Sequence, residues 1–224
     1  MGHVIGDILP SAIGIAISPV PIIAVILMLF SARARQNGPA FLGGWLIGVT
    51  GVLVVVIAVT GIAGASSGGP STLAALIQLA LGVLLLVMAW LQWRKRPAPG
   101  QAAEPPKWMS AVDGMEPTQA LVMGVVLSAA NPKNLMLGAA AAISIGKAAL
   151  DLGPLLVVIV VFVLIASISI IVPVAYYLAG GDGAKRTMDG WKSWLEANNA
   201  TVMTVLLLVI GVAVAGKGLG ALIG

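Results

Sequence analysis

Long apolar runs alternate with short polar segments along the chain. A membrane-spanning helix needs about 20 consecutive apolar residues, and six runs reach that length. The segments between them are rich in Gly, Ser, Pro and charged residues, which favour turns. The predicted spans are 4–31, 39–63, 71–93, 117–146, 152–180 and 200–223.

Composition supports the same class. Hydrophobic residues make up 59% of the 224 residues and charged residues only 9%, whereas about a quarter of a soluble domain is charged. We therefore predict an all-α integral membrane protein with six transmembrane helices. The first run is too long for a signal-peptide core and is expected to be a retained span.

The residue inventory argues against an enzyme. Cysteine is absent and His3 is the single histidine, so disulfides, thiolate chemistry, histidine metal clusters and catalytic triads are excluded. No GxxxxGK[ST] loop for nucleotide phosphates occurs either. We expect no enzymatic activity, no cofactor and no metal site.

Basic residues are distributed unevenly over the loops. Cytoplasmic loops retain Lys and Arg, and nine such residues follow the first, third and fifth spans, against Lys147 and Lys217 on the other side. We expect a multi-pass protein of the cytoplasmic (inner) membrane with both termini outside. The net charge of +4 follows from this topology and gives no reason to expect nucleic acid. The nine residues are Arg33, Arg35, Arg94, Lys95, Arg96, Lys107, Lys185, Arg186 and Lys192.

One polar segment is amphipathic. In residues 184–198, Met188, Trp191, Trp194 and Leu195 recur at helical spacing. Such a helix can lie in the headgroup region with its rings toward lipid. We predict an interfacial helix, with a plain linker carrying interfacial tryptophans as the alternative.

Prolines interrupt the first and fourth runs at matching places. Pro19 and Pro132 are 113 residues apart, and the same offset brings the start of the first span onto the start of the fourth. Each half then holds three spans, so the second half enters the membrane in the opposite sense. We predict two inverted three-helix repeats with broken helices 1 and 4. The repeats are 1–96 and 117–224, joined by a Pro-rich cytoplasmic linker at 97–116.

Paired broken helices are typical of transporters whose substrate site lies near the midplane. Proline removes a backbone donor and clashes with the preceding turn, so Pro19, Pro21 and Pro132 are expected to break their helices. Pro173, near the end of the fifth span, is a further candidate hinge. The alternative is that these prolines only kink their helices.

Lys133 lies near the centre of the fourth span. A charge there costs about 3 kcal/mol on insertion scales, and its side chain is too short to reach either interface. We expect it to face the bundle interior, where the carbonyl end of half-helix 117–130 or an anionic substrate group could partner it. A lysine that is only structural, or one that carries a proton, is the alternative. The predicted substrate-binding residues are Lys133, Asn131, Asn134 and Ser18, and Ser167 and Ser169 could line the same cavity.

The "SPVP" of the first span and the "NPKN" of the fourth, with six spans and a long central loop, resemble the lysine-exporter (LysE) superfamily. Within it, the chain is similar to the actinobacterial GAP/Sap (glycolipid and sulfolipid addressing) proteins over nearly its whole length. Pro19 and Pro21 match the first motif, and Asn131, Pro132 and Lys133 match the second. The resemblance implies a homodimeric exporter of cell-envelope glycolipids.

Exporters of cations or basic amino acids would need an acidic residue deep in the membrane, and none of the predicted spans has one there. We therefore expect a secondary-type exporter or flippase for an anionic or glycosylated envelope lipid. There are two alternatives. One is an exporter of a small solute such as an amino acid, and the other is a non-transporting scaffold for a larger lipid-export system. A lipid carrier should have an apolar lateral opening that leads to Lys133. A solute exporter should have a sealed polar pocket, and a scaffold should tolerate Lys133→Ala.

Overall fold

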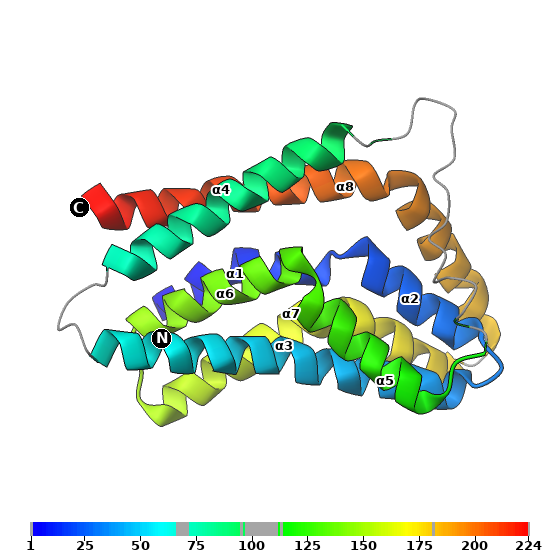
Figure 1. Ribbon diagram of the computed structural model, residues 1–224. Helices are drawn as coiled ribbons and strands as arrows, with labels where there is room; N and C mark the ends of the chain where they lie inside the picture. The colour runs from blue at the N-terminus through cyan, green and yellow to red at the C-terminus, as the bar shows by residue number, and fades with distance from the viewer. Residues whose placement is uncertain are drawn as a thin grey trace.

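Helices account for nearly all of the described chain, in agreement with the predicted all-α membrane protein (Figure 1). The computed structural model describes residues 2–65, 72–94, 96, 112, 114–180 and 182–223. The predicted linker at 97–116 falls largely outside these residues. The elements are α1 (Gly2–Ala16), α2 (Pro19–Phe30), α3 (Ala34–Ala65), α4 (Thr72–Arg94), α5 (Pro117–Val125), the π-helix η2 (Val126–Ala130), α6 (Pro132–Lys147), α7 (Leu152–Gly180) and α8 (Asp182–Ile223).

The predicted breaks in the first and fourth spans are confirmed at Pro19 and Pro132, whereas Pro21 lies inside α2 and breaks no helix. The axes of α1 and α2 differ by 51°, and those of Pro117–Ala130 and Pro132–Lys147 by 62°. Four further helices are long and apolar enough to cross a membrane, and counting each bent pair as one span gives up to six. Both breaks lie near the middle of the bundle (Figure 1).

The two halves pack on one another in corresponding ways. α3 packs against α5 and α6, and α7, its counterpart in the second half, packs against α1 and α2. In the same way α8 contacts α2, and α4 contacts α6. The last helices of the two halves, α4 and α8, run along each other (Figure 1). This packing relates corresponding helices of the two halves, and the inverted orientation of the two repeats stays a prediction.

Two predicted boundaries differ from the structure. α3 begins at Ala34 rather than 39, because Arg35 and Gln36 are good helix formers. Pro39 lies inside the helix and removes one backbone hydrogen bond from its second turn without ending it. The amphipathic segment 184–198 is helical, but it joins the last span in one helix, Asp182–Ile223, since no proline interrupts it. Figure 1 shows α8 turning between its first part and its last. Whether the first part lies in the headgroup region stays a prediction.

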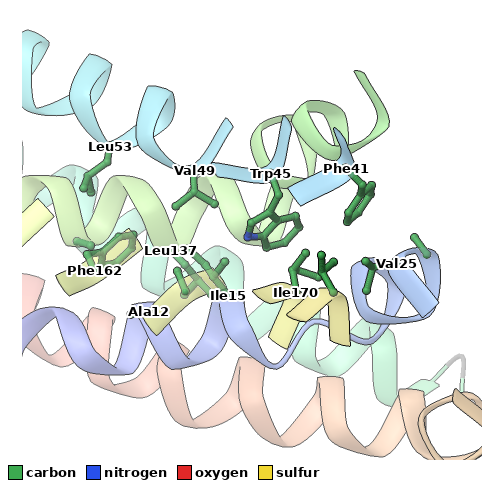
Figure 2. Close-up of a cluster of buried hydrophobic side chains, with 14 of the residues drawn as sticks. Ala12, Ile15, Val25, Phe41, Trp45, Val49, Leu53, Leu137, Phe162 and Ile170 are labelled. Carbon is green, nitrogen blue, oxygen red and sulfur yellow. The ribbon is translucent and has the colours of Figure 1, made fainter. Parts of the chain in front are cut away.

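The core fills the space between α3 and the helices α1, α6 and α7. Figure 2 shows Phe41, Trp45, Val49 and Leu53 on one face of α3, directed toward residues of α1, α2, α6 and α7. Burial of these side chains removes their apolar surface from contact with lipid and fixes the helices that flank both breaks.

Glycines allow α3 and the α5–η2 segment to approach closely. A Cβ atom on Gly44 would overlap the carbonyl oxygen of Leu121, and one on Gly48 would overlap the hydroxyl of Ser128. The small faces at these two positions therefore serve helix packing. They hold α3 against the segment that leads into the second break.

The two ends of the bundle differ in the loops that they carry. Figure 1 shows both chain termini and the α6–α7 turn at one end. The turn between α2 and α3 and the start of α8 lie at the other end, which carries Arg33, Arg35 and Lys185 and is called the basic end below.

Candidate functional site

Both breaks have the same local cause. Pro19 and Pro132 are the first residues of α2 and α6, a position where a missing N–H costs nothing. A residue before proline avoids the helical region. Accordingly Ser18 (φ −94°, ψ 106°) and Asn131 (φ −71°, ψ 118°) are extended. Asn131 also accepts a hydrogen bond from the Lys133 amide at 3.0 Å and caps α6.

Lys133 crosses from the second break to the first. Its Nζ donates to the carbonyl oxygen of Gly14 at 2.6 Å and to the hydroxyl of Ser18. In a continuous helix the Gly14 carbonyl would accept from the Ser18 amide, but Ser18 has left the helical conformation. The ammonium group therefore occupies a backbone acceptor that the break releases.

Asn134 binds a backbone carbonyl beside the break in its own half. Its Nδ2 donates to the carbonyl oxygen of Leu127 at 3.1 Å, and its Oδ1 accepts from the Ser18 hydroxyl at 3.2 Å. The offset of 113 residues that relates Pro19 to Pro132 also relates Gly14 to Leu127. Lys133 and Asn134 are adjacent in α6. Lys133 binds the Gly14 carbonyl in the first half, and Asn134 binds the equivalent carbonyl of Leu127 in the second half.

The acceptors of the lysine are neutral. Gly14 lies in the last turn of α1, whose carbonyl end carries partial negative charge that favours a cation. Lys133 is 2% exposed, and neither of its two acceptors is a carboxylate. An ammonium group has three N–H donors, and its third has no acceptor within the described part of the chain. A positive charge on this amine would therefore have no carboxylate partner among the described residues.

One expectation needs correction. The carbonyl end proposed for Lys133 was that of half-helix 117–130, whereas the lysine bonds to α1 and Asn134 takes the carbonyl of Leu127. The geometry explains the exchange. Lys133 directly follows the proline that opens α6, and its side chain extends across to the other broken helix.

Three of the four predicted substrate-binding residues come together. Lys133, Asn134 and Ser18 form one hydrogen-bonded group and are each 2% exposed. Asn131 is adjacent, and its side-chain oxygen is used as the helix cap. Their binding to a substrate stays a prediction.

The residues expected on the fifth span have other surroundings. Ser167 is fully buried, and its hydroxyl has no hydrogen-bond partner among the described residues. Ser169 is partly buried. Pro173 lies inside α7, which stays helical from Leu152 to Gly180, and its role as a hinge stays a prediction. Pro173 is buried, and it removes one backbone hydrogen bond from the helix without ending it.

A second polar group lies toward the end that carries the termini. Gln78 of α4 is 3% exposed and donates to the Ser144 hydroxyl at 3.3 Å, while its Oε1 accepts from Lys147 Nζ at 3.2 Å. Sequence reasoning missed this group. The signal was a glutamine within an apolar span, where a buried amide needs partners.

Ion pairs join the two halves at both ends of the bundle. Lys217 of α8 contacts Asp7 of α1 at 2.7 Å and also donates to the Asp7 carbonyl. At the basic end Arg33 lies 3.4 Å from Glu116, the residue that precedes α5. Sequence alone could not pair these residues, because each pair joins distant parts of the chain.

One family model matches residues 8–220, and its description is Sap, sulfolipid-1-addressing protein. No curated protein and no solved structure matches the chain. The match extends over nearly all of the 224 residues and includes both breaks and the group around Lys133. The chain belongs to the Sap (sulfolipid-1-addressing protein) family.

Proposed function

We propose that this protein is a secondary-type exporter or flippase for an anionic or glycosylated cell-envelope lipid, and that Lys133 binds the polar headgroup. The family is named for the addressing of a sulfolipid, which supports a role in lipid export. A sulfate group is anionic, and anionic groups are the partners that a buried ammonium favours.

The burial of the Lys133 amine is the observation that carries this proposal. Its ammonium group lies between two broken helices, bound only by a carbonyl and a hydroxyl. Such a group near the midplane is expensive to insert and is a functional site by default. The start of α6 adds the partial positive charge of a helix N-terminus, so an arriving anion would meet both.

Export from this arrangement requires movement, because Lys133 is buried. Separation of α1 from α6 would open the group to the membrane. The headgroup could then replace Gly14 or Ser18 as an acceptor for the lysine. The breaks at Ser18 and Asn131 are the points where this movement needs the fewest helical hydrogen bonds to change.

Surface lipids of a deletion strain test the proposal. Surface-extractable lipids would be compared after complementation with wild type, Lys133→Met and Lys133→Ala, at matched protein levels in the membrane. Lys192→Met, which removes a lysine at the basic end, is the matched control. We expect wild type and the control to restore a surface lipid that neither Lys133 variant restores.

The remaining outcomes separate the alternatives. Full rescue by Lys133→Ala would overturn the binding role and favour a scaffold for a larger lipid-export system. An unchanged lipid profile in the deletion strain would overturn lipid export and favour a small solute such as an amino acid. A homodimer, which the family resemblance implies, would be measured separately by light scattering in detergent.

A further inference from the structure

A cavity of about 300 Å³ opens at the basic end of the bundle. Residues 32–36, where the α2–α3 turn enters α3, line it together with Tyr177 of α7. This volume is at the lower end of the range for small-ligand sites. The cavity is formed by both halves of the chain and lies apart from the group around Lys133.

Positive charge dominates its lining. Arg33 and Arg35 both line it, and guanidinium groups bind oxyanions with two parallel hydrogen bonds. Lys185 Nζ lies 5.9 Å from the centroid of the Tyr177 ring, which adds a third cation beside the cavity. The first turn of α3, a helix of 32 residues, borders it as well, and its dipole favours an anion.

The neighbouring aromatic residues indicate the depth of this cavity in the membrane. The ring of Tyr176 lies 6.2 Å from that of Trp191, centroid to centroid. Trp191 and Trp194 are both exposed. Tyrosine and tryptophan concentrate where the hydrocarbon meets the headgroups. We infer from these residues that the cavity lies at the depth of the polar part of a lipid.

We propose that this cavity is a binding site for the phosphate or sulfate group of an anionic lipid headgroup, held by Arg33 and Arg35. The site extends the proposed export function, because it would collect the headgroup at the basic end before the lipid reaches Lys133. Its ligand binding does not depend on transport and can be measured separately.

Glu116 competes with the anion for Arg33. The two side chains form an ion pair at 3.4 Å, and both are more than half exposed, so the pair contributes little stability. An anion in the cavity would draw Arg33 from Glu116. Removing the Glu116 charge should therefore strengthen anion binding, while removing the charge of Arg35 should weaken it.

Native mass spectrometry of the full-length protein in a neutral detergent tests the site. The probes are phosphatidic acid and phosphatidylcholine with the same acyl chains, with inorganic phosphate as a competitor. We expect wild type to retain phosphatidic acid over phosphatidylcholine. Arg35→Gln should lower this retention roughly five- to tenfold, as expected for the loss of one charge-assisted contact. Glu116→Gln should raise it, and it keeps the cap of α5 in which the backbone N–H of residue 116 donates to Gln119 Oε1 at 2.9 Å.

Arg96→Gln is the matched control, because the Arg96 guanidinium stacks on Trp93 at 3.7 Å and does not line the cavity. It should leave retention unchanged. Displacement by millimolar inorganic phosphate would support a site that recognises the oxyanion itself, and resistance to it would support a site that also holds the acyl chains. Equal retention of the two lipids by wild type, or unchanged retention in Arg35→Gln, would overturn the proposal.

The two proposals fail separately. Headgroup binding at Arg35 combined with normal export by Lys133→Met would leave this site standing and overturn the role of Lys133. Loss of export in Lys133→Met combined with unaltered lipid retention in Arg35→Gln would support the role of Lys133 and overturn the headgroup site at the basic end.

Discussion

The ammonium group of Lys133 donates to the carbonyl oxygen of Gly14, 119 positions earlier in the chain, at 2.6 Å. Each residue lies beside a helix break, and the two breaks belong to different halves. A hydrogen bond that joins them makes their geometry interdependent. Any movement that carries α1 away from α6 must break this bond or offer the lysine another acceptor.

The Ser18 hydroxyl joins the two side chains of α6, since it accepts from Lys133 and donates to Asn134. Ser18→Ala should lower the free energy of unfolding by about 1–3 kcal/mol, because a buried ammonium N–H and an amide oxygen lose their partner. Thermal unfolding of the purified protein in detergent measures this change.

Ser167→Ala is the control for that experiment. Ser167 is also a fully buried serine, but its hydroxyl has no partner in the described structure, so its removal should be neutral or stabilising. Equal destabilisation by the two substitutions would contradict the bridging role of Ser18.

Close packing of α3 on η2 gives a second prediction. In Gly48→Ala the new Cβ would meet the Ser128 hydroxyl and the Val125 carbonyl, and overpacking of this kind costs about 1–3 kcal/mol. Gly51→Ala, one turn later, meets nothing within 4 Å and should gain up to about 1 kcal/mol from helix propensity. Melting temperatures of the two variants should move in opposite directions.

The sequence was sufficient for some parts of this architecture. Proline at 19 and 132 dictates an extended residue before it and a helix after it, so both breaks could be predicted locally. A lysine at 133 in an apolar run could be expected to face inward. The side-chain partners could not be predicted in the same way. Gly14 is an acceptor only because α1 crosses α6 at that level, and no local pattern encodes a crossing.

The extent of the helix in residues 184–223 could not be predicted from local composition either. The charged segment with Trp191 and Trp194 differs in composition from the apolar run that follows, which suggested two elements. Backbone hydrogen bonding ignores that change, and the helix continues to Ile223. Composition predicts the surroundings of a helix better than its end, which needs a proline or a capping residue.

A third prediction concerns the polar group around Gln78. Gln78→Leu should weaken the contact between α4 and α6, because Lys147 and Ser144 each lose a partner. Interhelical hydrogen bonds in membranes average about 0.6 kcal/mol. A double-mutant cycle with Lys147→Met should therefore give a coupling energy of about 0.5–1.5 kcal/mol. A coupling indistinguishable from zero would contradict the hydrogen bond.

The ion pair between Asp7 and Lys217 allows the movement itself to be tested. The two side chains tie α1 to α8 at the end that carries the termini, at 2.7 Å. If a lipid leaves through this end, the tie must open during each cycle. The chain has no cysteine, so introduced thiols are the only ones that can react.

Asp7→Cys combined with Lys217→Cys should be joined by a short bifunctional methanethiosulfonate, and export of the surface lipid should then stop. A reducing agent should restore it, because it cleaves both mixed disulfides. Each single variant treated with the same reagent should keep exporting, since an exposed pair of this kind contributes at most about 1 kcal/mol. Continued export by the crosslinked protein would show that α1 and α8 stay together at this end, and that the lipid leaves by a path elsewhere in the bundle.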